Sequence, residues 1–183
     1  KSHRQTGVPR NPSGGPVAIR GYLIQTLVAL LDAVAPDGTF TAVTLEPHDE
    51  PEKVDIRWEA DDGTHQFVQV RSSKNGFTAV TVKQWIKELR ESDRPRKFKT
   101  AGKWSLCLVG RCEEDIFRLK PKDRRNVAIE EIGSSLPVLW DLASQGLARL
   151  FESVHVTPPS TEAQRMLVER LALRLLEDSI RGV

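Results

Sequence analysis

KVDIRWEADDGTHQFVQVRSSKNG (residues 53–76) contains two short segments of alternating apolar and polar residues, joined by the turn-forming sequence DDGT. Alternation with a period of two is typical of β-strands, because successive side chains point to opposite faces of a sheet. We therefore predict a β-hairpin over residues 53–73. The alternation places one apolar set on one face (Val54, Ile56, Trp58, Val68 and Val70) and one polar set on the other (Asp55, Gln69 and Arg71).

Helical spacing of apolar residues is found on both sides of this hairpin. It predicts helices over residues 17–35, around 82–89, near 137–148 and over about 160–181, the last capped by Ser160 or Thr161. Further strands are predicted at FTAVTLEP (40–47), at the continuous apolar run WSLCLVG (104–110) and at FESVHV (151–156), while residues 111–135 fit neither pattern clearly. The order α-β-β-β-α-β-α-β-α predicts an α/β sandwich with a mixed sheet.

Length and composition indicate one globular domain. The chain has 183 residues, 39% of them hydrophobic, and we expect a flexible basic arm over residues 1–16 and a single domain over 17–183. Because the sequence does not begin with Met, we expect it to be a fragment of a larger multidomain protein. Two cysteines cannot form a disulfide framework, and no run of about 18 apolar residues predicts a membrane span, so a cytoplasmic location is expected.

The polar face of the hairpin allows two interpretations. One is a solvated face of an antiparallel sheet. The other is a binding site beneath the first helix, because polar side chains between a sheet and a helix are costly unless they are paired or bound to something. Gln25 on that helix and Glu46 before the hairpin could reach the same place, which gives a candidate constellation of Gln25, Glu46, Asp55, Gln69 and Arg71.

Three segments favour the second interpretation: RGYLIQTLVALLDAV (20–34), VTLEPHDEPEKVDIRWE (43–59) and QFVQVRSSKNGFT (66–78). Together they resemble the PD-(D/E)XK (restriction-endonuclease-like) superfamily, and more narrowly the double-stranded-DNA nuclease domains of bacterial anti-phage effectors. The resemblance covers about residues 20–80. It implies a restriction-endonuclease-like α/β/α sandwich with a central mixed sheet, and a metal-dependent DNA endonuclease whose sensor, NTPase or oligomerisation modules lie elsewhere in a longer protein.

Carried over position by position, the resemblance gives Asp55, Gln69 and Glu46 as ligands of Mg²⁺ or Mn²⁺, and Gln25 as an accessory polar residue on the first helix. Arg71 stands where the motif has lysine. Arginine keeps the positive charge but presents a planar fork and effectively never deprotonates, so it cannot act as a base. Two hypotheses follow: an endonuclease with an altered site, or a catalytically degenerate module of the same fold that binds DNA or protein.

Basic residues provide candidate phosphate contacts. Lys74 follows the motif, and Arg96, Lys97 and Lys99 lie in a predicted loop, with another basic stretch, RLKPKDRR, at 118–125. A solvated loop is the alternative, because neighbouring acidic residues dilute the positive field. The four tryptophans occupy apolar-periodic positions, which favours a role in the core over base stacking.

Overall fold

The computed structural model describes residues 14–35, 40–47, 53–92, 102–133 and 135–181. Five strands and six helices follow in the order α1-β1-β2-β3-α2-β4-α3-α4-β5-α5-α6. The helices are α1 (Gly14–Ala33), α2 (Ala79–Ser92), α3 (Glu114–Phe117), α4 (Pro121–Arg124), α5 (Leu136–Ser153) and α6 (Thr161–Arg181). The strands are β1 (Phe40–Leu45), β2 (Ile56–Ala60), β3 (His65–Ser72), β4 (Lys103–Val109) and β5 (Val127–Glu131).

The strands form one mixed sheet in the order β1-β2-β3-β4-β5. The first three strands make an antiparallel meander, in which Ile56 pairs with Val68 across the predicted hairpin. β3, β4 and β5 are parallel, and Arg71 pairs with Leu108. A parallel pair requires a crossover connection, which α2 provides between β3 and β4. β4 is buried along nearly its whole length, as its continuous apolar sequence predicted.

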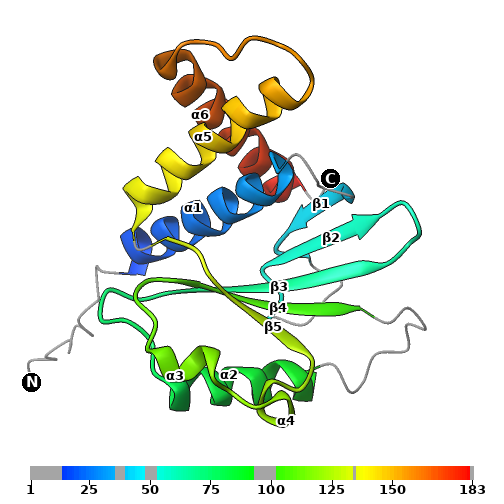
Figure 1. The fold of residues 1–183 in the computed structure, drawn as a ribbon, viewed down its shortest axis with the longest axis vertical. Helices are drawn as coiled ribbons and strands as arrows, with labels where there is room; N and C mark the ends of the chain where they lie inside the picture. The colour runs from blue at the N-terminus through cyan, green and yellow to red at the C-terminus, as the bar shows by residue number, and fades with distance from the viewer. Residues whose placement is uncertain (1–13, 36–39, 48–52, 93–101, 134, 182–183) are drawn as a thin grey trace, which may run out of the picture.

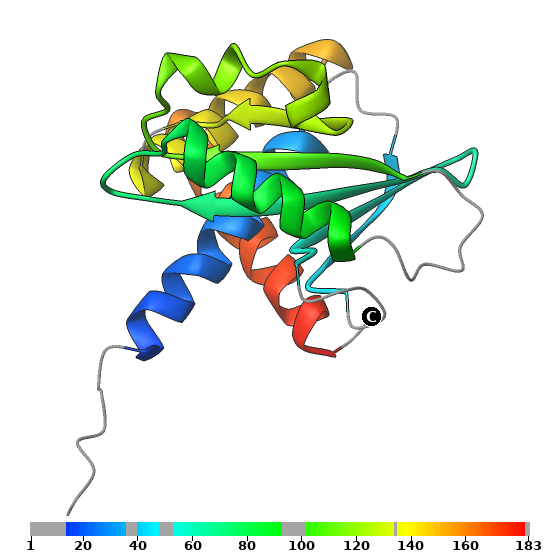
Figure 2. The same cartoon turned by 90° about the horizontal axis from the view of Figure 1, so that it is seen from below.

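Helices cover both faces of the sheet (Figure 1). On one face α1, α5 and α6 pack on a core that includes Ile56, Trp58, Val68 and Val70. On the other face α2 and the short α3 lie over a second core that includes Phe67 and Leu108. Figure 2 shows α2 crossing this second face. The protein is therefore an α/β/α sandwich with a central mixed sheet, as the sequence predicted.

Several local predictions are wrong. FESVHV forms no strand, because Phe151–Ser153 continue α5 and residues 154–160 form no regular element. Residues 111–135 contain α3, α4 and β5. Val54 does not share a face with Ile56: it packs in the core beneath α2, whereas Ile56 packs beneath α1. The helix predicted to start at residue 17 starts at Gly14, and the rest of the predicted arm lies outside the described residues.

The predicted cap of the last helix is confirmed, because the Ala163 N–H donates to Ser160 Oγ at 3.3 Å. Among the described residues, no helix combines the length and apolar character needed to cross a bilayer.

Candidate functional site at the carboxyl edge of the sheet

Three candidate residues lie at one edge of the sheet. β3, β4 and β5 end there, and β2, which runs in the opposite direction, begins there. Asp55 directly precedes β2, Glu46 directly follows β1, and Arg71 is the last but one residue of β3. Ligands of open α/β sheets bind outside the carboxyl ends of the parallel strands, so this edge is where a site is expected.

Asp55 closes the ladder between β2 and β3 with its side chain. Its N–H donates to the Val68 carbonyl at 3.0 Å, and its Oδ2 accepts the Val70 N–H at 2.6 Å. The carboxylate thus takes the place of a backbone carbonyl and lies in the plane of the sheet. Burial raises the pKa of Asp55 to about 7, the neighbouring Glu46 adds to the rise, and the Val70 N–H and Arg71 oppose it.

Glu46 is tied to Asp55 through the backbone. Its N–H donates to the Asp55 carbonyl at 2.8 Å, and its φ of 46° lies in the left-handed region, which is uncommon for a residue other than glycine. The chain therefore turns sharply where β1 ends, and this turn holds two carboxyl groups near each other at the edge of the sheet.

Gln69 and Arg71 lie beneath α2, not beneath α1 as predicted. Val68 and Val70 pack with α1, so alternation turns Gln69 and Arg71 to the opposite face, which they share with Phe67. Gln69 is only 2% exposed. The prediction that these two residues share a face is confirmed, but Asp55 lies at the boundary between the faces and the covering helix is α2.

Arg71 stacks on a tryptophan of α2. Its Cζ lies 5.5 Å from the centroid of the Trp85 ring, and its Nε is buried without a hydrogen-bond partner. The nearest acidic side chain of α2, Glu88, is already bound: Oε2 accepts from Lys53 Nζ at 2.8 Å, and Oε1 accepts from Gln84 Nε2 at 3.0 Å. These bonds, with a smaller contribution from Arg71, lower the pKa of Glu88.

The remaining sequence candidates are dispersed. Gln25 lies on α1, across the sheet from Gln69 and Arg71, and its side chain forms no hydrogen bond with any described residue. Lys74 is exposed just beyond the end of β3. Arg96, Lys97 and Lys99 lie outside the described residues.

Of the predicted metal ligands, Asp55 and Glu46 lie together at this edge, and Gln69 lies on the neighbouring strand β3 with its side chain beneath α2. No group of three His, Cys, Asp or Glu side chains in the described part of the chain is arranged to hold an ion. Asp55 has one oxygen engaged by the Val70 N–H and a raised pKa, and Gln69 is buried beneath α2. Mg²⁺ requires near-octahedral oxygen ligands, usually including ionised carboxylates, so Asp55 and Gln69 would not hold it without a further carboxylate such as Glu46.

A second polar cluster, which the sequence did not predict, lies beneath α1. Burial raises the pKa of Asp32 to about 6, with a contribution from Glu130, while Trp58 opposes the rise. Trp58 Nε1 is buried and forms no hydrogen bond of normal geometry. Cys107 Sγ lies 3.9 Å from Glu130 Oε2, and burial raises the pKa of the thiol. The sequence feature that could have indicated this cluster is the aspartate inside the apolar run LLDAV.

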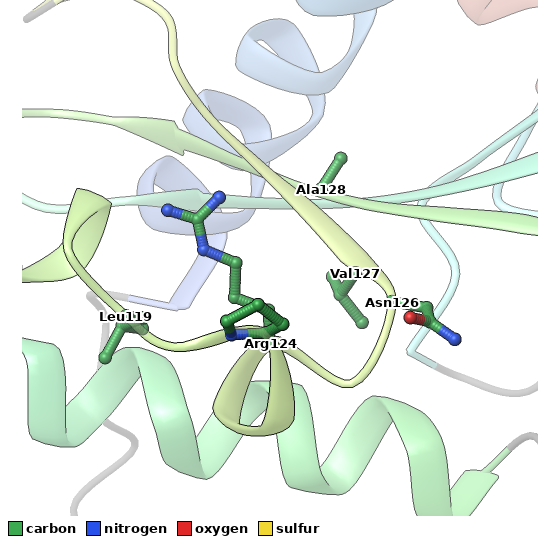
Figure 3. Close-up of a pocket in the computed structure, with 6 residues that line it drawn as sticks. Leu119, Arg124, Asn126, Val127 and Ala128 are labelled. Atoms are coloured by element: carbon green, nitrogen blue, oxygen red, sulfur yellow. The ribbon is translucent and has the colours of Figure 1, made fainter.

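Of two surface pockets, one lies at this edge of the sheet and the other lies at the opposite end of β5. One, of about 380 Å³, lies between the segments that follow β3 and β4, and residues 75–78 and 111–114 line it. These segments approach closely because Gly110, with φ 149°, has no Cβ: one built there would lie 2.5 Å from the Ser73 carbonyl oxygen. The other pocket, of about 340 Å³, lies at the start of β5 and includes Arg124 and Asn126 (Figure 3).

The fold and the edge site together define an α/β sandwich with an arginine at the carboxyl ends of its parallel strands. No protein-family model matches the chain, and no curated protein matches it significantly.

Solved structures do share the fold. A Cap4 SAVED/CARF-domain containing receptor from Moraxella osloensis matches with a TM-score of 0.58 and 8% identity, over 88% of this chain and 43% of that one. The Acinetobacter baumannii receptor of the same description, solved with the cyclic trinucleotide 3′3′3′-cAAA, matches with a TM-score of 0.57 and 8% identity, over 95% of this chain and 42% of that one. The chain thus spans less than half the length of these receptors, and identities this low establish similarity of fold alone.

Proposed function

We propose that this domain binds the phosphate backbone of double-stranded DNA at the carboxyl edge of its sheet, and that Arg71 makes the central contact. The observation that carries the proposal is the Arg71 guanidinium, which is held on Trp85 with a buried Nε that has no hydrogen-bond partner. A guanidinium is suited to phosphate because its N–H groups match the spacing of phosphate oxygens. Lys74, exposed just beyond β3, adds a second cation beside it.

The electrostatics of the edge support binding of an anion. Both oxygens of Glu88 accept hydrogen bonds from Lys53 and Gln84, so its attraction to Arg71 acts without a direct ion pair. Asp55, with a pKa of about 7, carries a full negative charge only above neutral pH. A phosphate approaching Arg71 therefore meets less negative charge than the sequence alone indicates.

We further propose that the domain is one module of a larger cytoplasmic receptor or effector of bacterial anti-phage defence. The resemblance of residues 20–80 and the fold shared with Cap4 receptors support this context. The matched segment is less than half of each Cap4 chain, which fits a module working beside separate sensor or oligomerisation modules.

Binding is tested with a fluorescent duplex in EDTA, comparing the wild type with Arg71→Met and with Arg174→Met as the matched control. Arg174 is an exposed arginine of α6 already paired with Asp178 at 3.0 Å. We expect roughly a tenfold loss of affinity for Arg71→Met, a salt dependence reduced by about one phosphate contact, and little change for the control. Equal affinities of the three proteins would contradict the proposal.

Metal-dependent cleavage of DNA, with Mg²⁺ or Mn²⁺ as cofactor, is the second candidate function. The proximity of Glu46 and Asp55 favours it, because a divalent cation would relieve the mutual repulsion that contributes to the raised pKa of Asp55. Glu131, the last residue of β5, also lies at this edge, but its Oε1 accepts the Cys112 N–H at 3.2 Å. Plasmid nicking in Mg²⁺ or Mn²⁺ that is lost in both Asp55→Asn and Glu46→Gln would favour this candidate; its absence in the wild type would leave DNA binding alone.

A further inference from the structure

We infer that Trp85 is a positioning residue that fixes the guanidinium of Arg71 for a phosphate oxygen, and that the site is therefore built for arginine at position 71. This inference rests on the proposed DNA binding and assigns a role to a residue outside the sequence motif. It also gives a physical reason for arginine at a position where the resembled family has lysine.

Trp85 is itself held in place. It lies on α2 between residues that point into the core, next to the fully buried Ile86. The Phe77 ring packs edge-on against it, with the ring centroids 5.7 Å apart. Phe77 is 4% exposed, and its N–H donates to the Arg111 carbonyl at 2.9 Å. The indole therefore offers a fixed surface to the side chain that stacks on it.

Stacking on this surface constrains Arg71 in a way that lysine cannot reproduce. A guanidinium is planar and weakly hydrated, so it packs on an aromatic face while its N–H groups remain directed outward from its rim. An ammonium at the same position is compact and strongly hydrated, and its direction is not set by a ring. Lysine at position 71 would keep the charge and lose the orientation.

The surroundings leave the orientated guanidinium unpaired within the described residues. Its Nε has no hydrogen-bond partner, and no described carboxylate forms an ion pair with it. Glu88, one helical turn beyond Trp85, contributes its two oxygens to Lys53 and Gln84 instead. The two Nη groups are not among the buried atoms and form no hydrogen bond within the described residues, so an incoming phosphate oxygen would bind donors that the protein itself leaves unpaired.

The test is a double-mutant cycle on duplex binding in EDTA with Trp85→Leu, Arg71→Lys and the double variant. Trp85→Phe keeps an aromatic face, and Trp140→Leu is the control for loss of a half-buried tryptophan on the opposite side of the sheet. We expect Trp85→Leu and Arg71→Lys each to weaken binding roughly 3- to 10-fold, as loss of a cation–π contact predicts. The double variant should bind no more weakly than Arg71→Lys alone, and Trp85→Phe and Trp140→Leu should remain within about twofold of the wild type.

Each result bears on the inference. Additive losses in the double variant, or equal losses for Trp85→Leu and Trp140→Leu, would overturn it, because either would assign Trp85 a structural role only. Tighter binding by Arg71→Lys would overturn it as well. If the wild type binds no duplex, the proposed function itself is overturned. This outcome differs from failure of the inference, in which the wild type binds duplex but the variants do not show the expected pattern.

Discussion

Replacing Asp55 with asparagine should stabilise the protein increasingly as pH rises from about 4 to 7, and should leave its stability nearly unchanged at about pH 4 and below. The amide oxygen of the new side chain can still accept the Val70 N–H, which Asp55 Oδ2 accepts at 2.6 Å, so the ladder between β2 and β3 stays closed. The substitution removes only the ionisation of a partly buried carboxyl group. The effect should therefore depend on pH and not on packing.

The raised pKa sets the size and sign of this effect. The pKa is about 7 in the folded protein against an ordinary value of 3.8, which corresponds to at most about 4 kcal/mol at 1.36 kcal/mol per pH unit. Solvent near the edge screens part of this, so we expect about 2 kcal/mol. Between about pH 4 and 7 the folded protein holds a proton that the unfolded chain has released, so wild-type stability falls as pH rises through that window and then levels off.

The measurement is urea unfolding of the wild type and Asp55→Asn at pH 5 and pH 8, with Asp62→Asn as control. Asp62 is a fully exposed aspartate whose pKa is lowered by hydrogen bonds from Thr64, so its replacement should bring no gain at pH 8. We expect the advantage of Asp55→Asn over the wild type to grow by about 1 kcal/mol between pH 5 and pH 8. The same stability difference at both values would refute the assignment of a buried, proton-holding Asp55.

Other substitutions and probes test the remaining parts of the structure. Gly110→Ala should lower the free energy of unfolding by about 1–3 kcal/mol, because its Cβ would lie 2.5 Å from the Ser73 carbonyl oxygen at a φ of 149°, and an unchanged melting temperature would contradict this. Thr78→Ala should cost about 1 kcal/mol by removing the acceptor of the Thr81 N–H at the start of α2, as measured by urea unfolding. Both thiols should react slowly with Ellman's reagent in the native protein at pH 7.5. Burial raises the pKa of Cys107, and it raises the pKa of Cys112 to about 11. Fast labelling of the native protein would contradict the burial of these two thiols.

The sheet and its hairpin were predictable because they depend on local pattern. Period-two alternation identified β2 and β3, and the uninterrupted apolar run at 104–110 identified β4 as a strand buried on both faces. The second half was harder to predict. The short α3 and α4 have too few residues to show a helical period, and FESVHV has strand-like composition but continues the apolar face of α5 for three residues.

The sequence indicated which neighbouring strand residues share a face, but not how the candidate residues are arranged in the fold. Alternation determines which residues share a face, as for Gln69 and Arg71, but it does not determine which helix covers that face. The crossover from β3 to β4 placed α2 there, and α1 packs on the opposite side. The position of Asp55 depends on a kink at the start of β2, where a side-chain oxygen replaces a backbone carbonyl, and no periodicity encodes this.

Trp85 illustrates a limit of another kind. Its apolar-periodic position on α2 correctly indicated a place against the core, where it packs with Phe77 and the second hydrophobic cluster. Trp85 and Arg71 are fourteen positions apart in sequence and lie on different elements. They meet because the crossover from β3 to β4 places α2, and with it the Trp85 ring, over the guanidinium. The arginine at position 71 could be interpreted physically only once this contact was known.

The most direct test of the central claim is an NMR titration of the Arg71 Nε–H group with a short DNA duplex in EDTA. Its signal is assigned by its loss in Arg71→Lys. If Arg71 contacts a phosphate, the Nε–H resonance should shift on addition of duplex, because the phosphate binds the Nη groups of the same guanidinium. An Arg71 Nε–H signal that stays unchanged while other resonances respond to DNA would contradict the account.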